Sequence, residues 1–329
     1  RVLFRSYFDI LFLLDCTMKG GPMARKSYRE DDIIIDVAAD QASMTLGALL
    51  DHKGYPRKSM KGLFDDKLVL LNGHKTNPKA VLAGGDQIRL QMPKEKLDYD
   101  PIPMDLTIVY EDHDILVIDK PVGLTVNSQG QVSLANGIAS YFKDQGIKRK
   151  IRFLNRLDRD TSGCVVIAKS GLAQSIYQGQ MDHHSFRKFY RAQVQGDLRK
   201  ADLSPDREGI DASDICNVLT QVCKTVYSLT FPMGRAADGI HQEVRADGKK
   251  TRTDFEILAY DSVNDQTQVK VELFTGRTHQ IRLAFAHLGY PLEGDTLYGA
   301  KSTGNPFSLR AHKIIFKHMR DGHKVTLDV

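Results

Sequence analysis

The chain has 329 residues, 41% of them hydrophobic, so it is long enough to form two domains, each with a core. Its 46 lysines and arginines against 41 aspartates and glutamates leave a formal charge of +5, which permits a polyanionic partner without requiring one. No two of its four cysteines have C-x-x-C spacing, which argues against a disulfide framework and favours reduced thiols in a cytoplasmic protein. The cysteines are Cys16, Cys164, Cys216 and Cys223.

The N-terminal end contains a short apolar run at residues 7–14. This run is far too short to span a bilayer. A secretory signal peptide is an alternative, but Asp9 and Asp15 interrupt and border the run, and no small-residue cleavage site follows it. We therefore interpret residues 1–31 as a disordered or non-native leader and expect no membrane partner.

Residues 32–95 predict a small domain in which two short helices precede a hairpin. Gly54 is suited to closing the first helix and Pro56 to opening the second. Asn72-Gly73 is a favoured dipeptide for a two-residue hairpin turn. The predicted elements are helices at 45–54 and 56–67 and strands at 68–71, 80–82 and 87–91.

The two predicted helices carry four basic residues close together, namely Lys53, Arg57, Lys58 and Lys61. Most such groups are simply solvated charged faces. However, the order of a basic helix pair, a hairpin and Gly-x-Asp at residues 84–86 resembles the S-four-like RNA-binding domain. In that family the basic helical face lies on RNA phosphates, so the resemblance implies that these four residues bind RNA.

Residues 96–104 carry several charges and two prolines, a composition typical of a linker. The following residues, 105–329, predict a larger second domain that alternates strands with helices and contains an irregular insertion at 197–225. Its predicted strands are 106–111, 115–120, 164–169, 186–196, 226–231, one within 243–261, and 267–274. Its predicted helices are 132–146, 170–181 and a segment that ends at Gly289.

The stretch R-L-D-R-D-T-S-G at residues 156–163 lies in a tight loop just before a predicted buried strand. Asp, Thr, Ser and Gly are ordinary turn residues, so composition alone favours a structural turn. A carboxylate at Asp158 between Arg156 and Arg159 would instead stay ionised, because nearby cations stabilise its charged form. Such a carboxylate can act as a nucleophile or as a base.

Three more stretches of the second domain matter because of their order. Taken singly they predict a turn, a core strand in which Tyr190 packs beside its neighbours, and a capped helix start. Together with R-L-D-x-x-T-S-G they resemble the RluA-type pseudouridine synthases over residues 105–318. The stretches are K-P-V-G at 120–123, K-F-Y-R-A at 188–192, and T-G-R-T-H-Q-I-R at 275–282 with G-D-T-L-Y-G at 294–299.

The resemblance implies an α+β protein with a mixed, mainly antiparallel catalytic sheet that isomerises uridine to pseudouridine in RNA. The family uses no cofactor and no metal, and the chain has no P-loop, no G-x-G-x-x-G after a strand and no H-E-x-x-H. Asp158 would attack the sugar or abstract a sugar proton, and Tyr190 would lie against the target base. Arg277 would pair with Asp158, and Arg156 would fill the gap left in the RNA by the flipped uridine.

Two positions depart from the family pattern: Asn155 and Ala284 stand where many members have His. They bear on the subfamily rather than on the reaction. We expect a monomer acting on RNA, ribosomal by default because an added RNA-binding domain suits a large structured substrate. Two alternatives remain open: a glycosidic-bond hydrolase using Asp158 with Asp160, and an RNA-binding protein whose synthase-like domain is inactive.

Overall fold

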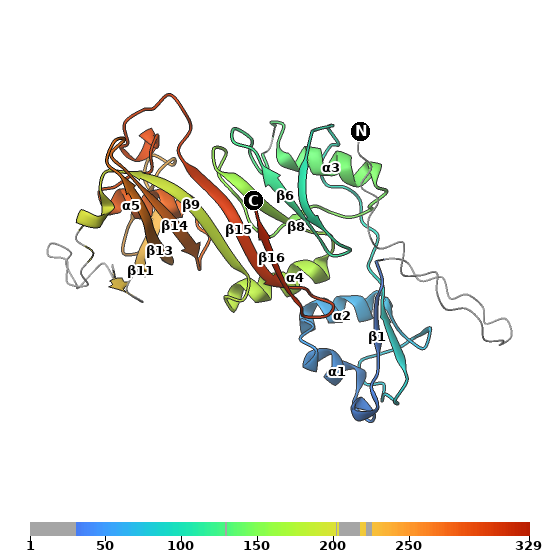
Figure 1. The fold of residues 1–329 in the computed structure, drawn as a ribbon. Helices are drawn as coiled ribbons and strands as arrows, with labels where there is room; N and C mark the ends of the chain where they lie inside the picture. Colours follow the sequence, from blue (N-terminus) through green and yellow to red (C-terminus); the bar gives the residue numbers. More distant parts are fainter. Residues whose placement is uncertain (1–30, 129, 202, 204–217, 222–225) are drawn as a thin grey trace, which may run out of the picture.

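The chain folds into two sheets, a small one near the N-terminal end and a large one that contains all the later strands (Figure 1). The computed structural model describes residues 31–128, 130–201, 203, 218–221 and 226–329. Strands and helices alternate as predicted, so the predicted α+β architecture is confirmed. Residues 1–30, residues 204–217 of the predicted insertion, and Cys16, Cys216 and Cys223 lie outside the described residues.

The small sheet has the order β1-β4-β2-β3, and all of its strand pairs are antiparallel. Thr45 caps the first helix, because its side chain accepts a hydrogen bond from the Ala48 amide at 3.3 Å. Asn72 and Gly73 have φ angles of 50° and 85°, as the predicted hairpin turn requires. The elements are β1 Ile33–Asp36, α1 Leu46–His52, α2 Arg57–Asp65, β2 Val69–Leu71, β3 His74–Lys75 and β4 Gln87–Leu90.

The strand predicted at residues 80–82 does not form. Only an isolated bridge at Val81 joins this segment to its neighbour. The Pro78 and Ala80 carbonyls instead accept hydrogen bonds of 2.9 and 2.8 Å from the first two amides of α1. The segment therefore supplies acceptors to helix N–H groups that have no partner within the helix, and its strand pairing is limited to this one bridge.

The large sheet has the order β10-β11-β13-β14-β9-β15-β8-β6-β5, and only β15 and β8 run parallel. Figure 1 shows α5 beside β13 and β14 and α3 beside β6, at opposite ends of this sheet. The strands are β5 Thr107–Glu111, β6 Ile115–Lys120, β7 Arg152–Phe153, β8 Ser162–Ala168, β9 Arg187–Gln195, β10 Val218–Gln221, β11 Val226–Arg235, β12 Gln242–Val244, β13 Lys249–Asp261, β14 Gln266–Leu273, β15 Leu309–Lys317 and β16 Lys324–Asp328. The helices are α3 Leu134–Asp144, α4 Gly171–Asp182 and α5 Gln280–His287.

Strands β6 and β8 are buried on both faces, which explains their unbroken apolar sequences. Leu116 and Ile118 of β6 belong to the apolar cluster that includes residues of α3. Ile115 and Val117 belong to the cluster that includes Tyr177 of α4. Successive residues of one strand thus enter two cores, because side chains alternate across a sheet.

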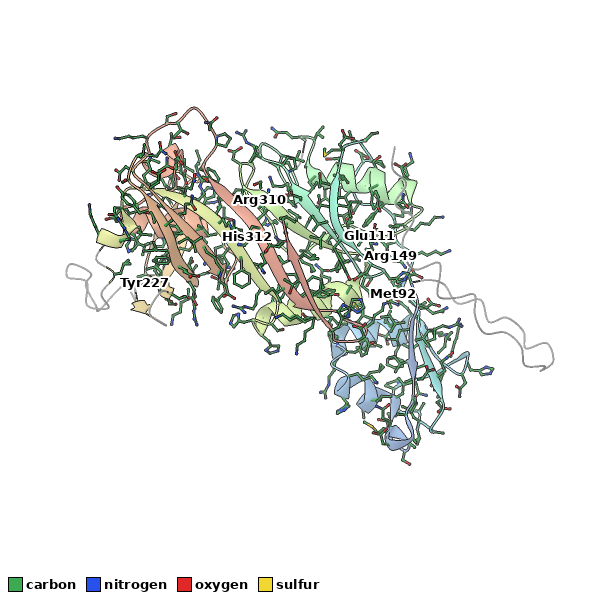
Figure 2. All side chains as sticks on the ribbon, viewed as in Figure 1. Met92, Glu111, Arg149, Tyr227, Arg310 and His312 are labelled. Carbon is green, nitrogen blue, oxygen red and sulfur yellow. The ribbon has the colours of Figure 1, made fainter. Side chains whose placement is uncertain are left out.

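Arg310 on β15 links the middle strands of the large sheet through its guanidinium (Figure 2). It donates hydrogen bonds to the Asp119 carboxylate of β6 at 2.7 Å and to the Ser162 hydroxyl at the start of β8 at 3.3 Å. These contacts hold the beginning of β8 beside the end of β6. The loop that carries R-L-D-R-D-T-S-G at residues 156–163, the signature loop, therefore joins the sheet at a fixed position.

The small domain lies directly against the large one, through α2 and α4 (Figure 1). Leu172 of α4 is 4% exposed and belongs to the apolar cluster of the small domain. Ser59 of α2 donates a hydrogen bond of 2.7 Å to Ser175 of α4, or accepts one from it. Arg320, which follows β15, donates to the buried Asp114 carboxylate at 2.6 Å and to the Asp32 carbonyl at 3.1 Å.

The segment predicted as a linker has no helix or strand, but it is fixed along the large domain. The Ile102 amide donates to the Asn136 carbonyl at 3.1 Å, and Asp98 accepts a hydrogen bond from the Ile151 amide at 3.0 Å. Leu97 and Tyr99 pack against the large apolar core. The segment is therefore held against the large domain along its length. Among the described residues, no helix is long and apolar enough to cross a membrane.

Candidate active site

The signature loop connects β7 to β8, and its own backbone and Asn155 shape it. The Thr161 amide donates to the Asp158 carbonyl at 3.1 Å, which closes a tight turn. Asn155 donates to the Cys164 carbonyl at 2.9 Å and accepts from the Val166 amide at 2.8 Å. The amide side chain thus pins the loop to β8, which gives Asn155 a structural role.

Gly163 at the end of the loop cannot carry a side chain. Its φ angle is 110°, and an added Cβ would lie 2.2 Å from the Ala311 carbonyl oxygen on β15. Real Cβ atoms do not approach a backbone oxygen so closely, and positive φ favours glycine. Gly163, the last residue of R-L-D-R-D-T-S-G, is therefore required by the close parallel contact of β8 with β15.

Lys120 at the end of β6 holds two loops together from inside the protein. It is fully buried, and its ammonium donates to the carbonyls of Pro121 at 2.8 Å, Leu124 at 2.7 Å and Arg159 at 3.0 Å. All three donors are therefore used. Burial lowers the pKa of Lys120 to about 8, although the nearby carboxylates of Asp160 and Asp158 oppose the shift.

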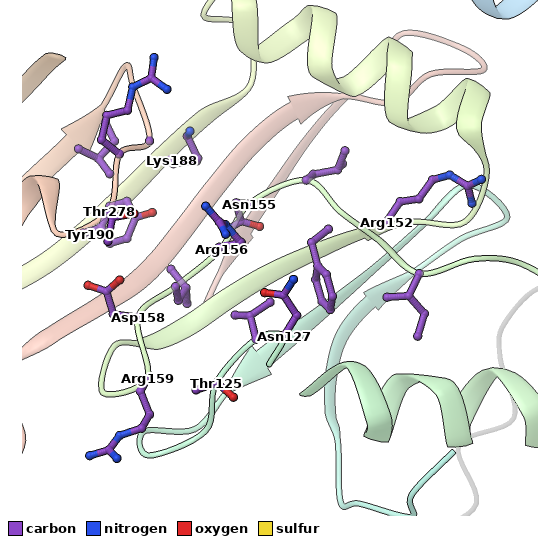
Figure 3. A pocket seen from close by; sticks show the side chains of 18 of the residues that line it. Thr125, Asn127, Arg152, Asn155, Arg156, Asp158, Arg159, Lys188, Tyr190 and Thr278 are labelled. Atoms are coloured by element: carbon purple, nitrogen blue, oxygen red, sulfur yellow. The ribbon is translucent and has the colours of Figure 1, made fainter. Parts of the chain in front are cut away.

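Tyr190 comes from β9 and is only 5% exposed. Figure 3 shows its hydroxyl pointing into a cavity above the Asp158 carboxylate. Burial, and then the negative charge of Asp158, raises the pKa of Tyr190 far above its ordinary value. The phenol therefore stays protonated at neutral pH and can donate a hydrogen bond.

The cation that pairs with Asp158 is Arg282, so the predicted pairing with Arg277 is wrong. The Arg282 guanidinium lies 3.8 Å from the Asp158 carboxylate. Arg277 precedes α5 in an exposed turn, where its amide donates to the Gln280 side chain at 3.1 Å. Because α5 begins at Gln280, the later arginine of T-G-R-T-H-Q-I-R lies on the buried side of the helix.

Arg282 is itself held by a dense set of contacts. It makes two hydrogen bonds of 2.7 Å to the Asp295 carboxylate, which is almost completely buried. The guanidinium also lies 5.1 Å from the centre of the Tyr298 ring and 4.4 Å from that of Phe307. G-D-T-L-Y-G thus supplies both an acid and an aromatic face to the cation beside Asp158.

His279 completes the surroundings of this ion pair. It lies in the left-handed region with φ of 56°, and its Nδ1 is 3.0 Å from the Tyr298 hydroxyl. Burial lowers the pKa of His279, although Asp158 partly opposes the shift. The imidazole is therefore neutral at physiological pH and fixes Tyr298 through a hydrogen bond.

Asp158 and Tyr190 line a cavity of about 610 Å³. The structure brings Asp158, Tyr190, Arg277 and Arg156 together in its lining, and Gln174 of α4 lies in it too. Figure 3 shows Asp158 and Tyr190 at one end and Arg152 at the other. A smaller recess of about 50 Å³ adjoins Asp158, His279 and Arg282. Asp160 lines neither space, which argues against a carboxylate pair for hydrolysis.

The predicted RNA-binding cations of the small domain do not line this cavity. Lys53, Arg57, Lys58 and Lys61 are all exposed on or beside α1 and α2. Arg57 forms an ion pair with Asp51 at 2.8 Å, and Lys61 forms one with Asp65 at 2.7 Å. Among the described residues, Lys53 and Lys58 contact no carboxylate. The positive charge of this face therefore rests mainly on two of the four.

Two overlapping groups of described side chains could hold a metal ion, and both lie by the β15–β16 connection. One is His318, Asp321 and His323, and the other is Asp112, Asp114 and His318. None of these residues lines the cavity that contains Asp158. These two groups of side chains are therefore not part of the site around Asp158.

The sequence between the small domain and α5 matches a known family. Residues 114–287, more than half of the chain, match the RNA pseudouridylate synthase family. The chain belongs to this family. It is an RNA pseudouridine synthase, and therefore an isomerase, of the RluA type.

Relatives match this synthase over nearly its whole length. The uncharacterised RNA pseudouridine synthase YlyB of Bacillus subtilis is 32% identical over 91% of this chain and 94% of its own. The ribosomal large subunit pseudouridine synthase D of Neisseria meningitidis is 28% identical over 93% of this chain and 80% of its own. The structure of human RNA pseudouridylate synthase domain containing 1 shares the fold, with a TM-score of 0.50 and 21% identity over 68% of this chain and 83% of that one.

Proposed function

We propose that this synthase modifies specific uridines of large-subunit ribosomal RNA and that Asp158 is its nucleophile. The observation that carries the proposal is the Asp158 carboxylate, paired with Arg282 and facing the cavity beside Tyr190. The relative from Neisseria meningitidis that is named for ribosomal large-subunit RNA supports the choice of substrate. The proposal includes a cytoplasmic location and a monomeric enzyme.

The reaction breaks the bond between ribose C1′ and base N1 and forms one between C1′ and base C5. The C5 hydrogen leaves as a proton, and N1 gains one, so nothing is oxidised. A carboxylate can assist by attacking C1′ or by removing a proton from the sugar. The Arg282 guanidinium, 3.8 Å from the Asp158 carboxylate, positions that carboxylate for either route.

Tyr190 is suited to holding the detached base rather than to removing its last proton. Its ring is buried against the core, and its hydroxyl has no partner among the described residues. Since its raised pKa keeps the hydroxyl protonated, Tyr190 can stack on uracil and donate to a carbonyl. It would be a poor base unless the substrate changed its surroundings.

Arg156 is proposed to fill the space vacated by the flipped uridine. It is exposed at the cavity, and no carboxylate among the described residues contacts its guanidinium. Flipping a nucleotide costs a few kcal/mol, and a planar cation that stacks in the gap would offset part of that cost.

The small domain is proposed to hold RNA at a distance from the chemistry, through Lys53, Arg57, Lys58 and Lys61. Gln174 of α4 lines the cavity, and α4 also packs on α2. A strand of RNA leaving the cavity past Gln174 would therefore meet the helices that carry these cations. Phosphate contacts of this kind add affinity without reading the sequence.

Release of tritium from RNA labelled at uracil C5 tests the proposed substrate. Transcribed fragments of large-subunit RNA, small-subunit RNA and transfer RNA are compared at equal concentration. Stoichiometric release from a large-subunit fragment is expected. Release only from transfer RNA or small-subunit RNA would contradict the substrate, and free uracil together with an abasic site in the RNA would favour hydrolysis.

A further inference from the structure

Lys188 lies in the cavity beside Tyr190 but has no role in the chemistry described so far. The two residues are two positions apart on β9, so their side chains leave the same face of the strand. Figure 3 shows Lys188 near Tyr190 and Thr278 at the cavity wall. Its ammonium is 3.8 Å from the place where a Cβ on Gly276 would be, so it lies against the turn that carries Arg277.

The Lys188 ammonium has no partner among the described residues. No carboxylate or hydrogen-bond acceptor contacts it, and burial lowers the pKa of Lys188 with no opposing negative charge. An ammonium partly removed from water without an acceptor raises the free energy of the free protein. A ligand that brings an anionic oxygen to this point would remove that cost.

Arg277 belongs to the turn against which Lys188 lies, and its side chain is exposed. It lines both the large cavity and the small recess, and no described carboxylate contacts its guanidinium. Two other cations around the cavity are neutralised, since Arg152 donates to Glu95 at 2.8 Å and Arg159 to Asp160 at 3.2 Å. Arg156 also lines the cavity without a described carboxylate partner, and it is the residue proposed to fill the gap left by the flipped uridine. Lys188 and Arg277 therefore form a pair of uncompensated positive charges next to Tyr190.

We propose that Lys188 and Arg277 bind the two phosphates that flank the target uridine and so hold the flipped nucleotide over Asp158. This inference rests on the proposed function, since it needs RNA in the cavity. Lysine would act as a point charge on one phosphate and arginine as a two-pronged donor on the other. Both are positioning residues, because they would contact the backbone and not the reacting atoms.

A phosphodiester fits these charges better than a uracil carbonyl does. Two cations from separate elements, β9 and the turn before α5, converge on one wall, whereas a neutral carbonyl would need only one neutral donor. Tyr190 already supplies such a donor next to Asp158. RNA carries one negative charge at each linkage, so two adjacent linkages match two adjacent cations.

The first test is the salt dependence of RNA binding. Lys188→Gln and Arg277→Gln are measured in an Asp158→Asn background, so that no turnover occurs. Each should flatten the slope of log K against log salt by about 0.7, and the two together by about 1.4. Lys143→Gln is the matched control, because Lys143 is an exposed cation on α3 outside the cavity lining. Its slope should equal that of the background.

The second test neutralises single phosphates in the RNA. One methylphosphonate linkage is placed 5′ or 3′ of the target uridine, and binding is measured for each variant. If Lys188 contacts one of these linkages, that substitution should weaken wild-type binding but have no added effect in Lys188→Gln. Arg277→Gln should show the same loss of effect at the other linkage.

Additive losses at both linkages together with unchanged slopes would overturn the proposal. A Lys188 variant with normal slope but impaired isomerisation would likewise overturn it, because the ammonium would then act on the base. Absence of tritium release from every ribosomal fragment would contradict only the proposed substrate. The slopes remain measurable in that case with any uridine-containing RNA hairpin, so the two failures can be told apart.

Discussion

The active-site cavity and the basic face of the small domain both use cations, but they hold them in opposite ways. Arg282 is buried, pairs with Asp295 through two hydrogen bonds, and lies against two aromatic rings. Lys58 is exposed on α2 and has no carboxylate partner among the described residues. The first cation is fixed to a single position, whereas the second is free to move with its solvent shell.

The difference follows from what each cation must do. Chemistry at one sugar carbon tolerates small displacements poorly, so the carboxylate and its partner need a rigid, buried setting. Attraction of a polyanion depends on charge and falls off gradually with distance. Substitutions in the cavity should therefore change rate or stability, and substitutions on the small domain should change only the electrostatic part of affinity.

The largest effect is expected for Asp158→Asn, which keeps the size of the side chain and removes its charge. Isomerisation should fall below detection, because no ionised carboxylate would remain near the sugar. RNA binding should stay within a few-fold of wild type. Tritium release and filter binding measure the two quantities on the same preparation.

Asp160→Asn is the matched control, since Asp160 is two residues away and lines neither the cavity nor the recess. It should retain most of the activity. Turnover well above background in Asp158→Asn, or total loss in Asp160→Asn, would remove Asp158 from the nucleophile's role.

The second effect concerns Arg282→Gln, which leaves the Asp295 carboxylate buried without its partner. Breaking such a pair costs about 3–5 kcal/mol, so chemical denaturation should show that loss in the free energy of unfolding. Turnover should also fall by orders of magnitude, because Asp158 loses the same cation. Arg277→Gln, at an exposed turn, should change stability by less than about 0.5 kcal/mol.

The double variant Arg282→Gln with Asp295→Asn separates stability from catalysis. It should recover part of the lost stability, since no buried charge is left unpaired, while activity stays low. If Arg277→Gln were the unstable variant and Arg282→Gln nearly normal, the ion pair seen at Asp158 would be wrong.

The third effect concerns Lys120→Met, which leaves three buried carbonyls without the ammonium they share. We expect a loss of about 3 kcal/mol, since hydrogen bonds to a charged group contribute about 1.5–3 kcal/mol each and methionine regains some apolar burial. Urea denaturation at pH 7 measures it. A loss below about 1 kcal/mol would mean that the loops need no such clamp.

Lys120 also predicts a pH dependence with a definite sign. Its pKa is about 8 in the folded protein against an ordinary 10.5, so the unfolded chain holds more protons between these values. The free energy of unfolding of wild type should therefore rise from pH 8 to 10.5 relative to Lys120→Met. A flat difference across this window would show that the buried ammonium keeps its ordinary pKa.

The smallest effect is expected on the small domain, where only affinity should respond. Replacing Lys53, Arg57, Lys58 and Lys61 together should flatten the salt slope by about two to four units. Lys53→Gln with Lys58→Gln should account for about 1.4–1.8 of it, since the other two cations already have carboxylate partners. Single-turnover rates at saturating RNA should remain near wild type.

An unchanged slope in the four-residue variant would make this face merely solvated. A collapsed rate with unchanged affinity would mean that the small domain shapes the cavity. Such an effect would pass through α4, which packs on α2 and places Gln174 in the cavity lining.

The sequence predicted those parts of the site whose signals are local. Asp158 and Tyr190 lie in short motifs that taken singly favour a turn and a core strand, and it is the order of these motifs, through the family resemblance, that pointed to the two residues. Helices α1 and α4 were predictable from residues that cap them, Thr45 and Ser170. Each of these features depends on a few neighbouring residues.

The partner of Asp158 could not be chosen in that way. Arg277 and Arg282 are five residues apart, and the choice depends on where α5 begins. That point is set by Gln280, whose side chain accepts from the Arg277 amide and donates to Thr253 on β13. Asp295, further along the chain, could have indicated which arginine is buried, because a carboxylate amid apolar residues needs a buried cation.

The contact between the domains was missed for a similar reason. Leu172 follows a helix cap and has the sequence surroundings of an ordinary core residue. These surroundings do not indicate which of the two cores it joins. The structure places it in the small domain's cluster, while Ala173 beside it belongs to the large one. Which of two cores receives a side chain depends on the relative placement of elements far apart in the chain.

The shared side chain Leu172 also bears on how the protein comes apart. Separating the domains would expose Leu172 and Ile176 of α4 and would break the hydrogen bond from Arg320 to the Asp32 carbonyl. The exposure of apolar surface and the loss of a hydrogen bond from a charged donor oppose such a separation at the same time. The two domains should therefore unfold in a single calorimetric transition. Limited proteolysis should not cleave the chain between the domains before the domains themselves are digested.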